Sequence, residues 1–92
     1  MVAGSFYSRS VQTAANTQFR VDDNERLVLS SINIHCYLAD AYYGERASQS
    51  GIIRANAVVW FDKPVKIADL WFKNVVAGAN TQIVITGTVL QD

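Results

Sequence analysis

One stretch decides how this chain folds: Arg26-Leu-Val-Leu-Ser-Ser-Ile-Asn-Ile-His-Cys-Tyr-Leu38. Its apolar and polar residues alternate, which is the period-two pattern of a β-strand with one buried face. The alternation changes phase once. Leu27 and Leu29 occupy odd positions, whereas the apolar residues that follow occupy even positions: Ile32, Ile34, Cys36 and Leu38. Because an inserted residue turns every later side chain to the other face, we expect a bulge or bend near Ser30-Ser31 that brings both sets onto one core.

The same alternation recurs along the chain, whereas apolar residues at helical spacing do not. Other strands are expected at Phe6–Thr13, Thr17–Val21, Ile52–Phe61, Val65–Val76 and Thr81–Leu90. Turn residues separate them at Ala14-Ala15-Asn16, Asp22–Glu25 and Asp62-Lys63-Pro64. The pattern predicts an all-β fold, a small antiparallel β-sandwich or jelly-roll-like domain with about six to seven strands.

The sequence also predicts a turn, a long loop and a glycine position with a special role in the backbone. Ala77-Gly78-Ala79-Asn80 lies between two apolar runs and is expected to be a hairpin turn, since Gly and Asn tolerate positive φ. Residues 39–51 lack clear alternation and are expected to form an irregular loop, with a short helical turn as an alternative. Gly87, within the last run, indicates a bend or the close approach of another backbone.

Length and composition bound the domain and its surface. The 92 residues correspond to one domain, 1–92, in which residues 1–5 are expected to be a flexible arm. Half of the residues are hydrophobic and only 17% are charged, which is a low charge content for a small monomer standing alone. We therefore expect part of the surface to contact another protein.

Charge and motif content exclude several classes of protein. Eight basic and eight acidic residues cancel and are scattered, so no basic patch for nucleic acid is present. One cysteine excludes an internal disulfide and every zinc pattern that needs two thiolates. No run approaches the length of a membrane span and the start lacks a signal-peptide pattern, so we expect a soluble chain made in the cytoplasm, with no membrane partner.

Reactive side chains are present, but none forms a convincing catalytic or metal site. His35 and Cys36 are adjacent in a strand, so they are expected to point to opposite faces rather than to form a dyad. The cluster Asp22–Glu25 lacks EF-hand spacing and its glycine, which favours a solvated turn over a cation site. The remaining carboxylates would need a deep cleft for two-carboxylate catalysis: Asp40, Glu45, Asp62 and Asp69. We assign no catalytic residue, metal ligand or cofactor, and we expect no enzymatic activity.

Aromatic and arginine side chains are the best candidates for function. These residue types anchor protein interfaces and also stack on sugars. The predicted contact residues are Tyr42, Tyr43, Arg46, Trp60 and Trp71. Two alternatives stay open: ordinary capping of the core by aromatics, and a sugar-stacking platform formed by Tyr42, Tyr43 and Trp60.

Two segments resemble small β-sandwich virion proteins of tailed bacteriophages and related viruses: Phe19-Arg-Val-Asp-Asp-Asn-Glu-Arg-Leu-Val-Leu29 and Leu70-Trp-Phe-Lys-Asn-Val-Val-Ala-Gly-Ala-Asn-Thr-Gln-Ile-Val-Ile-Thr-Gly87. The resemblance implies a non-enzymatic structural subunit of the virion, acting as a capsid decoration, spike-base or head–tail accessory protein. Its partners would be copies of itself and other virion proteins. A carbohydrate-binding or receptor-binding β-sandwich module, with a glycan as ligand, is the alternative.

Overall fold

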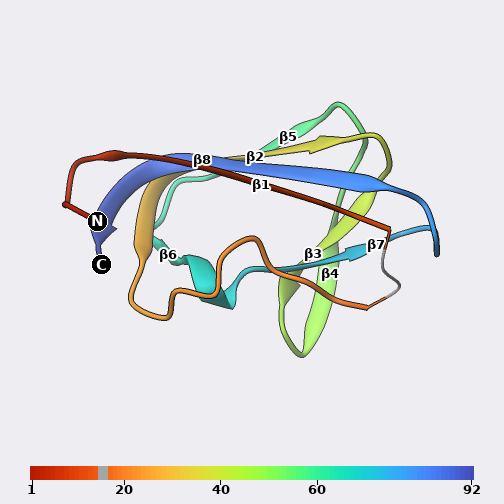
Figure 1. Cartoon of the computed structure of the whole chain (residues 1–92), viewed down its shortest axis with the longest axis horizontal. Coiled ribbons are helices and arrows are strands. Elements are labelled where there is room, and N and C mark those ends of the chain that lie inside the picture. Colours follow the sequence, from red (N-terminus) through yellow and green to blue (C-terminus); the bar gives the residue numbers. More distant parts are fainter. Residues whose placement is uncertain (15–16) are drawn as a thin grey trace.

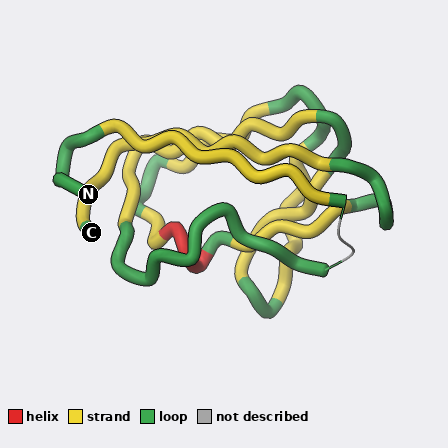
Figure 2. Tube along the Cα trace, viewed as in Figure 1, coloured by secondary structure: helices red, strands yellow, loops and turns green. Residues whose placement is uncertain are grey.

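A computed structural model describes residues 1–14 and 17–92 and shows two antiparallel sheets packed face to face (Figures 1 and 2). One sheet has the order β1-β8-β2-β5, with β6 also paired to β2, and the other has the order β4-β3-β7. The strands are β1 (Phe6–Thr13), β2 (Val28–Tyr37), β3 (Ala41–Glu45), β4 (Ser48–Ile53), β5 (Val58–Phe61), β6 (Val65–Lys66), β7 (Trp71–Asn74) and β8 (Thr81–Gln91). A 3₁₀ turn, η1 (Ile67–Asp69), precedes β7. The all-β sandwich is confirmed.

The strands form nested antiparallel pairs. β3 pairs with β4, β2 with β5 and β1 with β8. The segment before β2 adds the fourth pair, because Phe19 and Phe72 of β7 exchange both backbone hydrogen bonds, at 2.8 and 2.7 Å. One long antiparallel hairpin, rolled up so that successive pairs fall in alternate layers, is the topology of a jelly roll.

The predicted bulge in β2 is confirmed. The register against β8 runs Ser30↔Thr88 and then Asn33↔Thr86, so Ser31 and Ile32 both lie opposite Gly87. Ser31 has a φ of 52°, and the shift places both apolar sets of the strand in the core. The buried residues of that strand region are Leu27, Leu29, Ile32, Ile34 and Cys36, each at most 1% exposed.

Several predicted connections are wrong, because local residue patterns do not reveal which sheet the next strand joins. Residues 77–80 do not close a hairpin: β7 belongs to one sheet and β8 to the other. Residues 39–51 are not an irregular loop or a helical turn, since β3 and β4 form an antiparallel pair from Ala41↔Ile53 to Glu45↔Ser48, with one register shift between Tyr43 and Glu45.

Four strand predictions also change. Ile52–Phe61 is split where the chain changes sheets, and Asn56 adopts a φ of 66° in that crossing. Val65–Val76 is interrupted by η1, while Thr17–Val21 contributes one bridge rather than a strand. Leu38, expected in the core, is 59% exposed because its φ of 75° turns it out. The predicted turn at Ala14-Ala15-Asn16 includes two residues outside the described part of the chain.

Side chains hold together the end of the sandwich that contains the β2–β3, β4–β5 and β7–β8 crossings (Figure 1). The Asp40 carboxylate accepts hydrogen bonds from the Ala55 backbone N–H at 2.8 Å and from Arg54 at 2.9 Å, which joins two crossings. Both bonds keep the pKa of Asp40 below its ordinary value, the backbone bond being the larger cause. Buried Asn74 donates to the carbonyl of Thr13, the last residue of β1, and to that of Ala79 in the β7–β8 crossing. At the opposite end, the Gly4 backbone N–H donates a hydrogen bond to the Val89 carbonyl, which connects the expected N-terminal arm to β8.

We predict that Gly87→Val destabilises the domain by about 1–3 kcal/mol, the cost of overpacking a well-filled core. A Cβ atom at Gly87 would lie 3.1 Å from the Ser30 carbonyl oxygen and 3.6 Å from atoms of Leu29 and Ile32. Urea unfolding measures the effect. Thr88→Val is the control: it places a valine one position later, on the outer face, where it only replaces a hydroxyl by a methyl group, and it should stay within about 0.5 kcal/mol. Equal midpoints for the two variants would contradict this role of Gly87.

Candidate interaction surfaces

The five predicted contact residues do not share one surface: four lie on the two outer sides of the sandwich and one points into it. Tyr42 and Trp71 point outward from the three-stranded sheet, and Arg46 lies in the turn between β3 and β4. Tyr43 points inward and packs its ring 6.0 Å from that of Phe61. Trp60 is on the outer face of the other sheet and is 68% exposed. The structure therefore brings Arg46 and Trp71 together but divides the predicted sugar platform.

Trp71 is the centre of a cation–π cluster that we call the Trp71 cluster: Arg20, Arg46 and Trp71. The guanidinium carbon lies 4.8 Å from the indole centroid for Arg20 and 5.6 Å for Arg46. Arg20 reaches the ring because Phe19 pairs with Phe72, which places Arg20 beside Trp71 on the outer face. At an exposed site each such contact contributes about 0.5–1 kcal/mol, so the cluster fastens three chain segments together.

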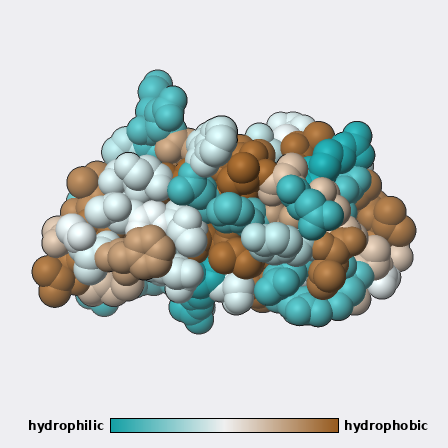
Figure 3. Space-filling model, turned by 90° about the horizontal axis from the view of Figure 1, so that it is seen from above, coloured by the Kyte–Doolittle hydropathy of each residue, from teal (hydrophilic) through white to brown (hydrophobic). Residues whose placement is uncertain are grey.

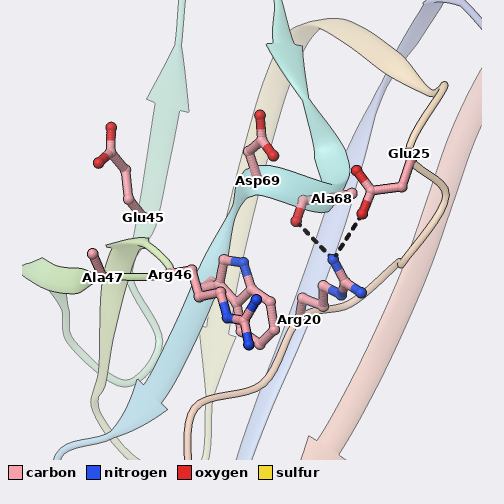
Figure 4. A pocket seen from close by; sticks show the side chains of 8 residues that line it. Arg20, Glu25, Glu45, Arg46, Ala47, Ala68 and Asp69 are labelled. Atoms are coloured by element: carbon pink, nitrogen blue, oxygen red, sulfur yellow. Dashed lines mark hydrogen bonds and ion pairs between the residues drawn. The ribbon is translucent and has the colours of Figure 1, made fainter.

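An open pocket of about 510 Å³ lies beside this cluster (Figure 4). It is lined by Arg20, Glu25, Glu45, Arg46, Ala47, Ala68, Asp69 and Trp71. Arg20 donates to Ala68 O at 3.2 Å and forms an ion pair with Glu25 at 3.4 Å; Lys66 also pairs with Glu25, at 3.2 Å. Figure 4 shows the carboxylates of Glu45 and Asp69 standing apart from the Arg20–Glu25 pair. The pocket thus offers both charges and one aromatic ring.

The outer face of the β1-β8-β2-β5 sheet has a different character. Strand register aligns its outward residues in rows across the four strands, for example Ser8, Thr86, Asn33 and Trp60. We call this surface the uncharged face: Phe6, Ser8, Ser10, Gln12, Asn33, His35, Tyr37, Val58, Trp60, Gln82, Val84, Thr86 and Thr88. It contains no Lys, Arg, Asp or Glu. Figure 3, which looks onto this side, shows near-neutral, hydrophobic and hydrophilic patches side by side.

Two large aromatic side chains project from this face. Phe6, at 72% exposed, and Trp60 are among the most exposed large hydrophobic residues in the described chain. Trp60 also lines an open recess of about 300 Å³ with Ser31, Ile32, Asn33, Phe61 and Asp62, next to the β2 bulge. Exposed aromatics beside a recess are typical anchors of protein interfaces.

The structure separates His35 from Cys36, as predicted. Cys36 is fully buried in the core, and its sulfur lies 3.1 Å from the Ala39 carbonyl oxygen. His35 is on the uncharged face, where its ring stacks on Tyr37 at a centroid distance of 6.2 Å. Burial, with a smaller contribution from Asp40, raises the pKa of the Cys36 thiol to about 11. The sulfur is therefore a neutral core atom near pH 7.

Carboxylate oxygens of the acidic turn Asp22–Glu25 form hydrogen bonds and ion pairs with other residues of the protein. Asp22 accepts hydrogen bonds from the Tyr7 hydroxyl at 2.9 Å, from Arg9 at 3.2 Å and from the Asn24 backbone at 2.9 Å. Burial and the bond to Asp22 raise the pKa of Tyr7 above its ordinary value. The turn predicted here is present, and it joins the two sheets through the Tyr7–Asp22 bond.

Sequence reasoning missed two features: the contact of Arg20 with Trp71, and the uncharged face as one continuous surface. Arg20 joins Trp71 only because residues far apart in sequence become neighbours. The face was detectable in part: the outward positions of Phe6–Thr13 and Thr81–Leu90 are Ser, Thr, Gln or apolar, without a charge on either strand's outer parity.

Comparisons with protein-family models, curated proteins and solved structures found no match. Within the described residues, no helix is long and apolar enough to span a membrane.

We predict that a thiol reagent modifies Cys36 only when the domain unfolds, because the sulfur is buried and protonated. At pH 8, native protein should react at least a hundredfold more slowly than protein in denaturing urea, as followed by release of the reagent's chromophore. An introduced surface thiol, Ser50→Cys, is the control and should react at once. Rapid labelling of native wild-type protein would show that the core around Cys36 opens readily.

Proposed function

We propose that this protein is a non-enzymatic structural subunit of a virus particle, capsid-associated in a decoration, spike-base or head–tail accessory position. It acts through protein–protein contacts with its own copies and with other virion proteins. The observation that carries the proposal is the uncharged face with its exposed Phe6 and Trp60.

The absence of charge makes this face suited to association with another copy. In a two-fold contact the same patch meets itself, so each charge on it would lie near an identical charge. Desolvating an unpaired charge is costly, whereas Ser, Thr, Gln and Asn side chains can donate and accept. Four strands present a surface large enough for their contact to bury on the order of 1,000 Å², which is the lower range for specific interfaces.

The topology and the two resembling segments support the virion part of the proposal. Jelly rolls occur in viral capsid proteins and also in lectins, so this support is an analogy at the level of the fold. The resemblance to small phage virion proteins favours the first of these two classes. The low proportion of charged residues agrees with a subunit that is partly covered in an assembly.

We predict that Thr86→Lys weakens association at least tenfold, because it adds a charge to the central row of the face, between Ser8 and Asn33. Light scattering over a wide concentration range would give the oligomeric mass of the purified chain. Ile52→Lys, which adds a lysine at an exposed outward position of the other sheet, should associate as wild type does.

Thermal unfolding of both variants would show that they fold. A wild-type chain that stays monomeric at every concentration, and that does not co-sediment with virus particles assembled from its co-encoded structural proteins, would contradict the proposed function.

The pocket beside the Trp71 cluster favours one second candidate, a carbohydrate-binding module. Its volume lies within the roughly 300–1,000 Å³ of small-molecule sites, and an indole with nearby carboxylates suits a sugar ring and its hydroxyls. This site differs from the platform expected from sequence, since it uses Trp71 and not Trp60, Tyr42 or Tyr43.

Fluorescence titration tests the carbohydrate candidate. In a Trp60→Phe variant, Trp71 is the sole indole, because the chain has two tryptophans. A lectin-like site predicts a saturable change in emission with at least one member of a panel of neutral and acidic oligosaccharides, and loss of the response in Arg46→Ala. An unchanged spectrum across the panel would eliminate this candidate.

A further inference from the structure

The β1 strand is a long edge of its sheet. Residues 6–12 pair with β8 on one side, and no described strand pairs with their other side. An edge strand of this kind displays a row of N–H and C=O groups that can pair with another chain.

The direction of these backbone groups follows from the pairing with β8. The Val89 N–H donates to the Ser5 carbonyl at 2.9 Å, so Ser5 and Val89 form a hydrogen-bonded pair. Such pairs alternate along an antiparallel ladder, which assigns the backbone groups of Tyr7, Arg9 and Val11 to β8. The backbone groups of four residues therefore point to the open side: Phe6, Ser8, Ser10 and Gln12.

This edge carries few of the devices that prevent pairing. It contains no proline, no lysine and no register shift against β8. Its one charge, Arg9, lies on the inner parity and is the one such device on this strand, but it is paired with Asp22 at 3.2 Å. The opposite edge of the same sheet differs, since β5 is short and is broken from β6 by Asp62-Lys63-Pro64. The pattern on β1 is typical of a strand that is covered in the functional assembly.

We infer that β1 pairs antiparallel with β1 of a second copy of this chain, about a two-fold axis, to make one continuous sheet. The inference rests on the proposed function and adds a second contact between copies, separate from the uncharged face. A pair centred on Arg9 would place two arginines directly opposite each other, which is unfavourable. Pairs centred on Ser8 or Ser10 instead place Arg9 opposite Tyr7 or Val11 of the other copy, and they align the outward backbone groups.

The contact is expected to be weak by itself. Either register forms about six backbone hydrogen bonds, each contributing about 0.5–1.5 kcal/mol net, and it buries less than a standard interface. A covalent trap is therefore the suitable test. Hydrogen-bonded antiparallel residues have Cα atoms about 5.5 Å apart, which is within the range of a disulfide.

We predict that Ser8→Cys or Ser10→Cys forms a disulfide-linked dimer under mild oxidation, at least tenfold faster than Ser50→Cys. Ser50 is an exposed serine in β4, the edge strand of the other sheet, and is the matched control. Wild-type protein is the second control, because its only cysteine is buried. Non-reducing electrophoresis and intact mass measure the dimer, and the faster variant identifies the register.

Each outcome separates this inference from the proposed function. Equal, slow cross-linking of all three variants, with wild-type protein still oligomeric and Thr86→Lys disruptive, would overturn the β1 pairing and leave the structural role standing. If the cysteine variants do not cross-link but Ser8→Pro abolishes association with particles, the edge receives a strand from a different protein and the second-copy inference is wrong. Monomeric protein in every experiment would overturn both proposals.

Discussion

The packing of both sheets depends on one extra residue in β2. This strand lies inside its sheet, between β8 and the β5–β6 edge, and it supplies core residues from both of its halves. Without the bulge at Ser31, either Leu27 and Leu29 or the later apolar set would face solvent. Burying each large aliphatic side chain contributes about 1.5–3 kcal/mol, whereas an unfavourable backbone conformation such as that of Ser31 costs about 1–3 kcal/mol. The gain from the two leucines alone exceeds that cost, and Gly87 provides the space.

Periodicity predicted the faces of this fold better than its connections. The bounds of β1, the bulge and the outward direction of Trp60 all follow from local alternation, which reports burial directly. The partner of each strand is not local: the nested pairing sets Phe6 opposite Thr88, at the two ends of the chain. A turn segment such as Ala77-Gly78-Ala79-Asn80 therefore marks where a strand ends, but it does not reveal whether the next strand joins the same sheet.

The β3–β4 pair was overlooked for a different physical reason. Its inward positions include Gly51, which breaks the apolar alternation, and the ring of Tyr43 on the neighbouring strand lies over that glycine. A Cβ atom at Gly51 would come within 2.5 Å of this ring. At this position the buried side chain therefore comes from Tyr43 of β3, and β4 contributes only the backbone of Gly51. The candidate surfaces depend on pairing in the same way, because Arg20 joins Trp71, and the uncharged rows form, only once the strands are ordered.

The distribution of charge gives the molecule two unlike sides. Ion pairs connect Arg20 and Lys66 to Glu25, and Arg54 to Asp40, while the outer positions of β1, β8, β2 and β5 carry none of the sixteen Lys, Arg, Asp and Glu residues. An edge contact through β1 lies in the plane of the sheet and leaves the uncharged face open. Two copies joined in this way would present twice the face as one surface, so that docking on a further protein would bury on the order of 2,000 Å². A weak edge contact and a weak face contact can therefore support each other in an assembly of many copies, because each raises the effective concentration for the other.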